Sequence, residues 1–208
     1  MTFFEFKIQN SKFKMKNGNN FELERSDLTS SQHKARIFKQ LPAQLIAPEN
    51  FQPYGQVIYP TPDGKRYDVD DAQLVFGGKP HFYILHLLNQ GRKFHHLARH
   101  LQCTQCLGSL GGKDWFMAVA PVSEPSEIDL DQLRAFLIPG NCFIKLAAGT
   151  WHAGPHFDDE FIDFYNLELT DTNINDYHTC NLKELYSWEV EIIRQVWEIE
   201  NSASLDLR

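Results

Sequence analysis

The feature that most limits the possible folds is a succession of short β-rich runs, each bounded by Gly, Pro, Asn or Asp. The runs have four to nine residues and cover residues 82–88, 115–120, 135–138, 142–146 and 161–169. Several short strands at regular spacing are typical of a β-sandwich or a β-barrel. No strand–helix–strand rhythm appears between them, which argues against a doubly wound parallel sheet. We therefore expect a mainly β protein.

The chain divides into one domain and a shorter N-terminal part. At about 150 residues per domain, 208 residues predict one domain with extensions. Residues 1–39 are polar and irregular, with one candidate hairpin at Asn17-Gly18. We expect residues 1–39 to be an extension that the fold does not require, and residues 40–208 to form the domain.

The C-terminal part of this domain has a different pattern. Its apolar residues recur at helical spacing: Leu182, Leu185, Tyr186, Val190, Ile193, Val196 and Trp197. This spacing predicts one amphipathic helix over about residues 182–199. Asn181 precedes it and is a suitable N-cap.

Charge and composition exclude several classes of partner. The 20 Lys and Arg against 27 Asp and Glu give a net charge of −7, which argues against binding to a nucleic-acid backbone. No window of about 18 apolar residues is present, so we expect no membrane partner. The first 13 residues lack the apolar stretch of a secretory signal. With only four Cys, free thiols in a reducing cytoplasm are the expected state.

Histidines gather in two stretches, residues 94–105 and 149–157. The first holds His95, His96 and His100 beside Arg99 and Gln105, and the second holds His152 and His156. Inward residues of distant strands meet at one mouth of a small barrel, and neutral imidazole is both a common metal ligand and the usual acid–base group. The pattern favours a shared site over separate structural histidines. Because His100 and Gln105 are five residues apart, both can face inward only if the chain bends between them.

Other candidate groups have two interpretations each. Lys145, between two apolar residues, is either an outward side chain in water or an inward cation that holds an anion. Asp163 could orient a histidine. Cys103 and Cys106 form a C-x-x-C pair, but without a strand–helix–strand context or a second pair the favoured interpretation is buried free thiols.

Several motifs resemble those of the ureidoglycolate lyase family in type and in order, over about residues 45–182. The opening strand has Phe51 and Pro53-Tyr54-Gly55, and the middle motif has Arg99-His100 followed by Thr104-Gln105. The late motifs are Trp151-His152 and Asp163-Phe164.

The resemblance implies a cupin-like β-barrel (an RmlC-like jelly roll), a homodimer, and a site inside the barrel. It implies cleavage of ureidoglycolate to glyoxylate and urea in purine (allantoin) nitrogen catabolism. It places the metal ligands at His100, Gln105 and His152, with Ala98 where the family carries Glu. His96 is considered as a replacement ligand, although we take strand alternation to oppose it. Ala98 has no ligand atom, so we expect a divalent metal, nickel or zinc, to bind weakly.

The chemistry assigns a role to each candidate residue. His100 and His152 suit an acid–base pair, and Gln105 can hydrogen-bond the urea group. Arg99 or Lys145 is the expected clamp on the substrate carboxylate, and His156 a further substrate-binding residue. The alternative is a non-catalytic cupin that binds a small acidic metabolite or a metal.

Overall fold

The computed structural model describes residues 7–8, 11–12 and 36–195, and the chain divides into two compact units, Met1–Ala35 and Arg36–Arg208. In the first unit, β1 (Lys7–Ile8) pairs antiparallel with β2 (Ser11–Lys12). The hairpin expected at Asn17-Gly18 lies outside the described residues.

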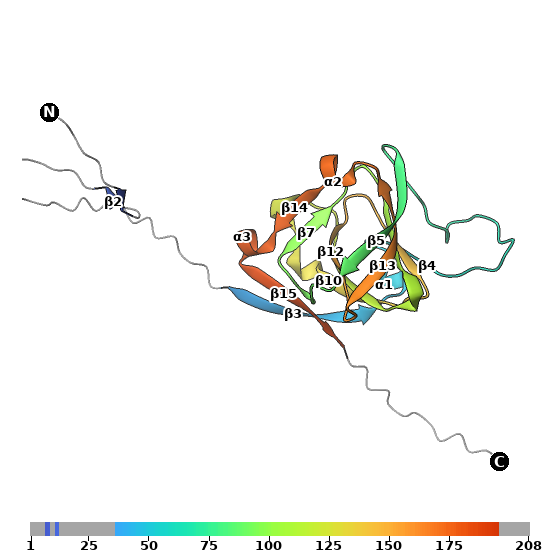
Figure 1. Cartoon of the computed structure of the whole chain (residues 1–208), viewed down its shortest axis with the longest axis horizontal. Helices are drawn as coiled ribbons and strands as arrows, with labels where there is room; N and C mark the ends of the chain where they lie inside the picture. Colours follow the sequence, from blue (N-terminus) through green and yellow to red (C-terminus); the bar gives the residue numbers. More distant parts are fainter. Residues whose placement is uncertain (1–6, 9–10, 13–35, 196–208) are drawn as a thin grey trace, which may run out of the picture. The chain divides into compact units, whose positions relative to one another are not determined.

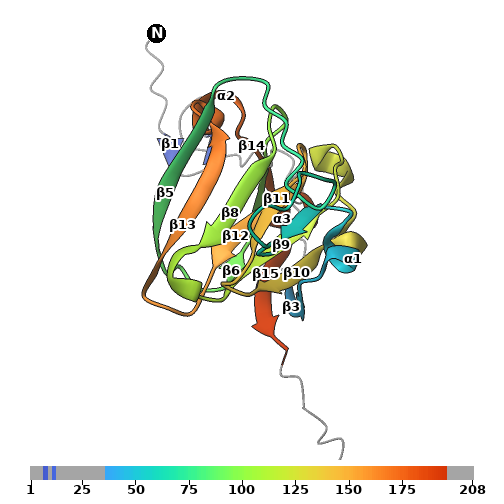
Figure 2. The same ribbon diagram turned by 90° about the vertical axis from the view of Figure 1, so that its right-hand side faces the viewer.

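The second unit is a curled β structure made of two sheets (Figures 1 and 2). One has eight strands in the order β14-β7-β12-β9-β10-β3-β15-β6. Their bounds are β14 His178–Asn181, β7 His96–Arg99, β12 Trp151–His156, β9 Trp115–Ala120, β10 Arg134–Ile138, β3 Ile37–Leu45, β15 Trp188–Arg194 and β6 Lys93–Phe94.

The other sheet has five strands in the order β4-β11-β8-β13-β5. Their bounds are β4 Gly55–Ile58, β11 Phe143–Leu146, β8 Gln105–Ser109, β13 Phe161–Leu169 and β5 Pro80–Leu88. The long strands β5 and β13 run side by side along one side of the barrel (Figure 2). The expected mainly β, cupin-like fold is confirmed.

Helices are few and short in the described part of the chain. The α-helices are α1 (Pro48–Phe51), α2 (Thr172–Asn175) and α3 (Leu182–Tyr186), and the 3₁₀ helices are η1 (Leu110–Gly112), η2 (Pro125–Glu127) and η3 (Leu130–Gln132). None of them is long and apolar enough to cross a membrane.

Strand β9 shows how the sequence builds the core. Its six residues are all buried, because alternate side chains face two different apolar clusters. Trp115, Met117 and Val119 belong to the cluster between the sheets, and Phe116 and Ala118 belong to a second cluster. A continuous apolar run is the pattern of a strand that is covered on both faces. The first cluster also contains Leu107 and therefore forms part of the wall of the pocket described below.

The predicted helix over residues 182–199 is wrong in most of its length. Asn181 does cap a helix, because its Oδ1 accepts hydrogen bonds from the amides of Lys183 (3.1 Å) and Glu184 (3.3 Å). This helix is α3, however, and it ends at Ser187, whose φ is 62°. The next residues form strand β15, and residues 196–199 lie outside the described part.

The sequence of residues 188–194 also has the two-residue apolar alternation of a strand, in addition to its helical spacing. Val190 and Ile192 alternate inward and are buried, and β-branched residues suit a pleated surface. Parallel pairing of β15 with β3, from Trp188 opposite Ile37 to Arg194 opposite Ala43, then decides the outcome. Because β3 begins at Ile37, the folded domain starts before the expected boundary at residue 40.

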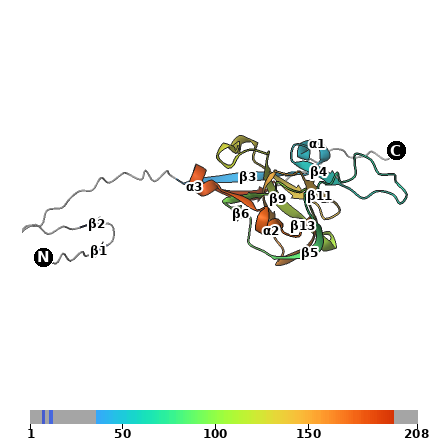
Figure 3. The same cartoon turned by 90° about the horizontal axis from the view of Figure 1, so that it is seen from above.

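The connection between β4 and β5 projects from the barrel (Figures 1 and 3). Ion pairs from Lys65 to Asp68 (2.7 Å) and to Asp71 (3.0 Å) hold the connection together. The Gln56 amide ties it back to β4 by donating to the carbonyl of Val69 (3.1 Å).

Candidate active site

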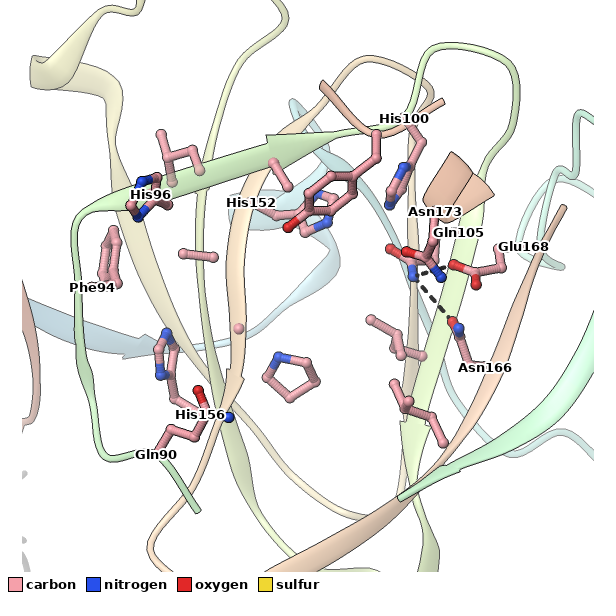
Figure 4. Close-up of a pocket in the computed structure, with 18 of the residues that line it drawn as sticks. Gln90, Phe94, His96, His100, Gln105, His152, His156, Asn166, Glu168 and Asn173 are labelled. Carbon is pink, nitrogen blue, oxygen red and sulfur yellow. Dashed lines mark hydrogen bonds between the residues drawn. The ribbon is translucent and has the colours of Figure 1, made fainter. Parts of the chain in front are cut away.

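A pocket of about 420 Å³ opens between the two sheets (Figure 4). One wall comes from β6, β7 and β12 of the eight-stranded sheet, and the facing wall from β5, β8 and β13 of the five-stranded sheet. Of the predicted site residues, it brings together His100, Gln105, His152 and His156, and it leaves out Arg99 and Lys145.

His100 and His152 form the centre of one end of the pocket. Pairing of β12 with β7 sets His152 opposite Ala98, two residues before His100, and the two imidazole rings lie 5.3 Å apart between centroids. Nδ1 of His100 lies 2.8 Å from the carbonyl oxygen of Asp176, and Nδ1 of His152 lies 3.2 Å from that of Thr150. Because a carbonyl only accepts, each Nδ1 carries a proton. In the neutral form of each imidazole, Nε2 then has a free lone pair.

Burial makes His152 a weak base. The pKa of His152 is lowered to about 4, mainly by burial and also by the nearby His100, while the hydrogen bond to Thr150 opposes the shift. His152 is therefore neutral at neutral pH, and its protonated form is a good proton donor.

The buried Asp176 fixes the position of His100. Its carboxylate accepts hydrogen bonds from the amides of Leu101 (2.8 Å) and Gln102 (2.8 Å), while its carbonyl holds His100. These bonds stabilise the turn between β7 and β8. The predicted bend between His100 and Gln105 is confirmed, since the chain passes there from one sheet to the other.

Four polar side chains on the facing wall form a closed hydrogen-bond ring, of which Figure 4 shows the two bonds made by Gln105. The Gln105 Nε2 group donates to Asn166 Oδ1 (3.1 Å) and to Glu168 Oε2 (3.1 Å). Asn166 Nδ2 donates to the Tyr83 hydroxyl (2.9 Å), which donates to Glu168 Oε1 (3.0 Å). A carboxylate only accepts, so Glu168 sets the orientation of the Gln105 amide. Gln105 Oε1 is buried without a partner.

Sequence reasoning missed Asn166 and Glu168, although alternation along β13 could have found them. Ile162 and Phe164 face the core, so the two even-numbered residues that follow also face inward. Asp163, which the sequence analysis singled out, has the opposite parity. It does bind a histidine, His86, whose Nδ1 lies 2.7 Å from Asp163 Oδ1, but His86 is exposed, Asp163 is half-buried, and both lie outside the pocket.

Arg99 is not a carboxylate clamp in this structure, because it faces away from the pocket. Its guanidinium is buried, lies 4.4 Å from the ring centroid of Trp151, and donates to the carbonyl of Ser123. Odd-numbered residues of β7 point to the second apolar cluster, where Leu97 is also buried. Arg99 therefore has a packing role.

Lys145 also lies outside the pocket. On β11 it pairs with Cys106 of β8, whose neighbour Gln105 faces the pocket, so Lys145 takes the opposite face of the sheet. It is nevertheless buried, and burial lowers the pKa of its ammonium group. All four cysteines are buried free thiols, as expected, and burial raises the pKa of Cys106 to about 12.

His96 and His156 lie at the other end of the same pocket (Figure 4). The expectation that alternation opposes an inward His96 was wrong, because residues 96, 98 and 100 are two apart and all line the pocket. His156 Nδ1 lies 2.9 Å from the carbonyl oxygen of Gly91, and burial lowers the pKa of His156. Its Nε2 is buried without a partner.

The donors near the histidine pair suit a metal ion only weakly. Within residues 36–195, no three His, Cys, Asp or Glu side chains gather closely enough to hold a metal. The free donor atoms are Nε2 of His100, Nε2 of His152 and Oε1 of Gln105. Ala98 lines the pocket between the strands but has no ligand atom. Imidazole suits zinc and nickel, but this set lacks an anionic ligand, which lowers its affinity for any divalent ion.

Comparisons with known proteins agree with the geometry. A family model described as ureidoglycolate lyase matches residues 70–191, more than half of the chain. This range contains the histidine pair and the whole of the hydrogen-bond ring. A search of the curated proteins finds no match.

Proposed function

Because the chain belongs to the ureidoglycolate lyase family, we propose that this pocket cleaves ureidoglycolate to glyoxylate and urea, a step of purine (allantoin) nitrogen catabolism. The observation that carries the proposal is the buried, unpartnered Oε1 of Gln105 beside two imidazoles with free Nε2 atoms. A ureido group has N–H donors for such an acceptor, and a carbinol needs a base.

The reaction requires only the transfer of one proton. His152 Nε2 takes the proton of the carbinol hydroxyl while the carbon–oxygen double bond forms and the carbon–nitrogen bond breaks. The departing nitrogen then receives that proton from the imidazolium, which yields urea and glyoxylate. The low pKa of His152 favours the second half of this exchange. His100 Nε2 accepts a hydrogen bond from a ureido N–H and so helps to hold the substrate in place.

The ring on the facing wall orients the substrate. Gln105 Oε1 accepts from the ureido N–H, and Glu168 holds the Gln105 amide in that orientation. The carboxylate of ureidoglycolate points away from Glu168, since like charges repel. Lys93 is the one cationic side chain among the described residues that line the pocket, and its ammonium lies 5.4 Å from the ring centroid of Phe38. Because Lys93 is exposed, the described part of the pocket offers the substrate carboxylate no buried Lys or Arg partner.

Glyoxylate release from ureidoglycolate tests the proposal. We expect His152→Ala to lower turnover by about 10²-fold or more, the usual contribution of an acid–base residue. His86→Ala is the matched control, because His86 lies outside the pocket, and its turnover should stay within about twofold of the wild type. Binding of ureidoglycolate without glyoxylate release by the wild type would contradict catalysis and support the non-catalytic alternative.

A weakly bound divalent metal, nickel or zinc, is part of this proposal. His100, His152 and Gln105 would hold it, and when bound it would polarise the substrate hydroxyl. We expect the protein to be metal-poor as purified and its activity to persist after chelation. Activity that disappears with the chelator and returns with the metal would overturn this part.

We also propose a cytoplasmic homodimer whose other partner is the small-molecule substrate. A group of exposed apolar side chains on β5 and β13 supports a self-association surface: Phe82, Ile84, Leu88, Phe161 and Tyr165. Strand β5 ends the order of its sheet, and such an edge is a natural place for pairing. Light scattering on the purified chain should give twice the mass of 24.1 kDa.

A further inference from the structure

The pocket is larger than ureidoglycolate needs. Ureidoglycolate has fewer than about ten non-hydrogen atoms, which fill less than about 300 Å³ even at the volume that a water molecule takes in the liquid. The pocket measures about 420 Å³. A ligand that fills it must extend beyond the histidine pair.

Two antiparallel strands give the pocket two ends. On β7, His100 follows the strand at one end and His96 begins it at the other. On β12, His152 and His156 are likewise four residues apart, and the pairing of His152 with Ala98 sets His156 beside Phe94. Along β7, four residues of strand span about 13 Å. Strand β12 has a bulge between Ala153 and His156, so its two histidines are about 10 Å apart along the strand. With its reacting carbon against His100 and His152, ureidoglycolate does not extend to His156.

The far end combines an aromatic side chain with an unmet polar group. Phe94 lies 5.7 Å from His156 between ring centroids, and Gln90 and His96 lie at the same end (Figure 4). The pocket lining also includes the apolar residues Leu85, Leu107 and Pro155. His156 Nδ1 is committed to Gly91, so its buried Nε2 is an acceptor without a donor. A buried acceptor of this kind indicates a ligand that brings a donor.

We propose that the natural substrate is longer than ureidoglycolate: a ureido carbinol acid whose reacting carbon carries an aromatic or apolar substituent with a hydrogen-bond donor at its tip. The ureido group lies against Gln105, the reacting carbon against His100 and His152, and the tip donates to His156 Nε2. This inference rests on the proposed function. The same carbon–nitrogen bond breaks and the hydroxyl proton goes to nitrogen, so the products are urea and an α-keto acid that carries the substituent.

Titration calorimetry of the full chain with three stable analogues tests the substrate class. The analogues are N-carbamoylglycine, N-carbamoylphenylalanine and N-carbamoyltyrosine, which lack the hydroxyl and cannot be cleaved. We expect the phenyl compound to bind about 10- to 100-fold more tightly than the glycine compound, the effect of burying such a side chain. The phenolic hydroxyl should add about fivefold, the effect of one hydrogen bond.

Two variants locate the effect at the far end. His156→Leu should remove the advantage of the tyrosine compound over the phenylalanine compound. The exposed position of His96 tolerates a larger side chain, so His96→Trp should fold and should block both long analogues. His86→Ala, outside the pocket, should change none of the three affinities.

Each outcome separates this inference from the proposed function. Equal affinities for the three analogues, or long-analogue binding that survives His96→Trp, overturn the longer substrate even if ureidoglycolate is cleaved. If the analogues bind in the expected order but ureidoglycolate is not cleaved, the result supports a ligand that reaches both ends of the pocket. It then contradicts the proposed cleavage of ureidoglycolate.

Discussion

Protonation of His152 should make the folded protein measurably less stable in weak acid. The imidazole is buried, and its pKa is lowered from 6.5 to about 4 in the folded state, mainly by burial and also by the nearby His100. Between these two pH values the unfolded chain binds more protons at this site, so a fall in pH favours unfolding. The contribution of His152 to the free energy of unfolding is therefore complete above pH 6.5 and is lost as the pH falls to about 4.

The size of this effect follows from the two pKa values. At about 1.4 kcal/mol for each unit of pKa difference, the full contribution is about 3 kcal/mol. About 2 kcal/mol of it is lost between pH 8 and pH 5. This is a large part of a marginal stability of about 5–15 kcal/mol.

Urea unfolding of the wild type and of His152→Gln, between pH 8 and pH 5 with a chelator present, measures the effect. Gln keeps a polar side chain but cannot titrate, and the contributions of groups that do not interact with His152 cancel in the difference between the two proteins. The wild type should lose about 2 kcal/mol more than the variant over this range. Parallel pH profiles would refute the reasoning, because His152 would then titrate alike in the folded and unfolded chains.

Three further predictions concern the residues around the pocket. Arg99→Met should lower the free energy of unfolding by about 1–3 kcal/mol, by loss of the buried hydrogen bond, and leave the KM for ureidoglycolate within about twofold; a large rise in KM would put Arg99 in the site. Ala98→Glu should raise the nickel or zinc content measured by elemental analysis, since position 98 lines the pocket; unchanged content would show that a carboxylate there does not reach the donors. Glu168→Leu should lower kcat/KM for ureidoglycolate about tenfold, because the Gln105 amide is then free to turn, while urea unfolding stays normal as the control. Unaltered kinetics would show that Glu168 does not orient the substrate.

The β-rich pattern was readable in the sequence because each strand is short and its ends carry turn residues. The two histidine stretches were readable for a similar reason, since imidazoles on separate strands of a barrel are expected to converge. The order of motifs such as Trp151-His152 carried the family resemblance, which the family match confirms.

Other features depended on contacts that no local pattern contains. Residues 188–194 fit a helix and a strand equally well, and the parallel pairing with β3 made them a strand. Arg99 carries a charge that suits a substrate clamp, but its place on β7 turns it toward Trp151 and Ser123. In both cases the partner is distant in sequence.

The composition of the pocket was decided by tertiary structure for the same reason. Glu168 reaches Gln105 because β13 pairs with β8, and Asp176 reaches His100 although 76 residues separate them. Residue types and their alternation set which side chains can face inward. Partners distant in the sequence occupy the other polar atom of His100, His156 and Gln105, and this leaves one acceptor of each side chain free. For His152 the partner is the nearby Thr150.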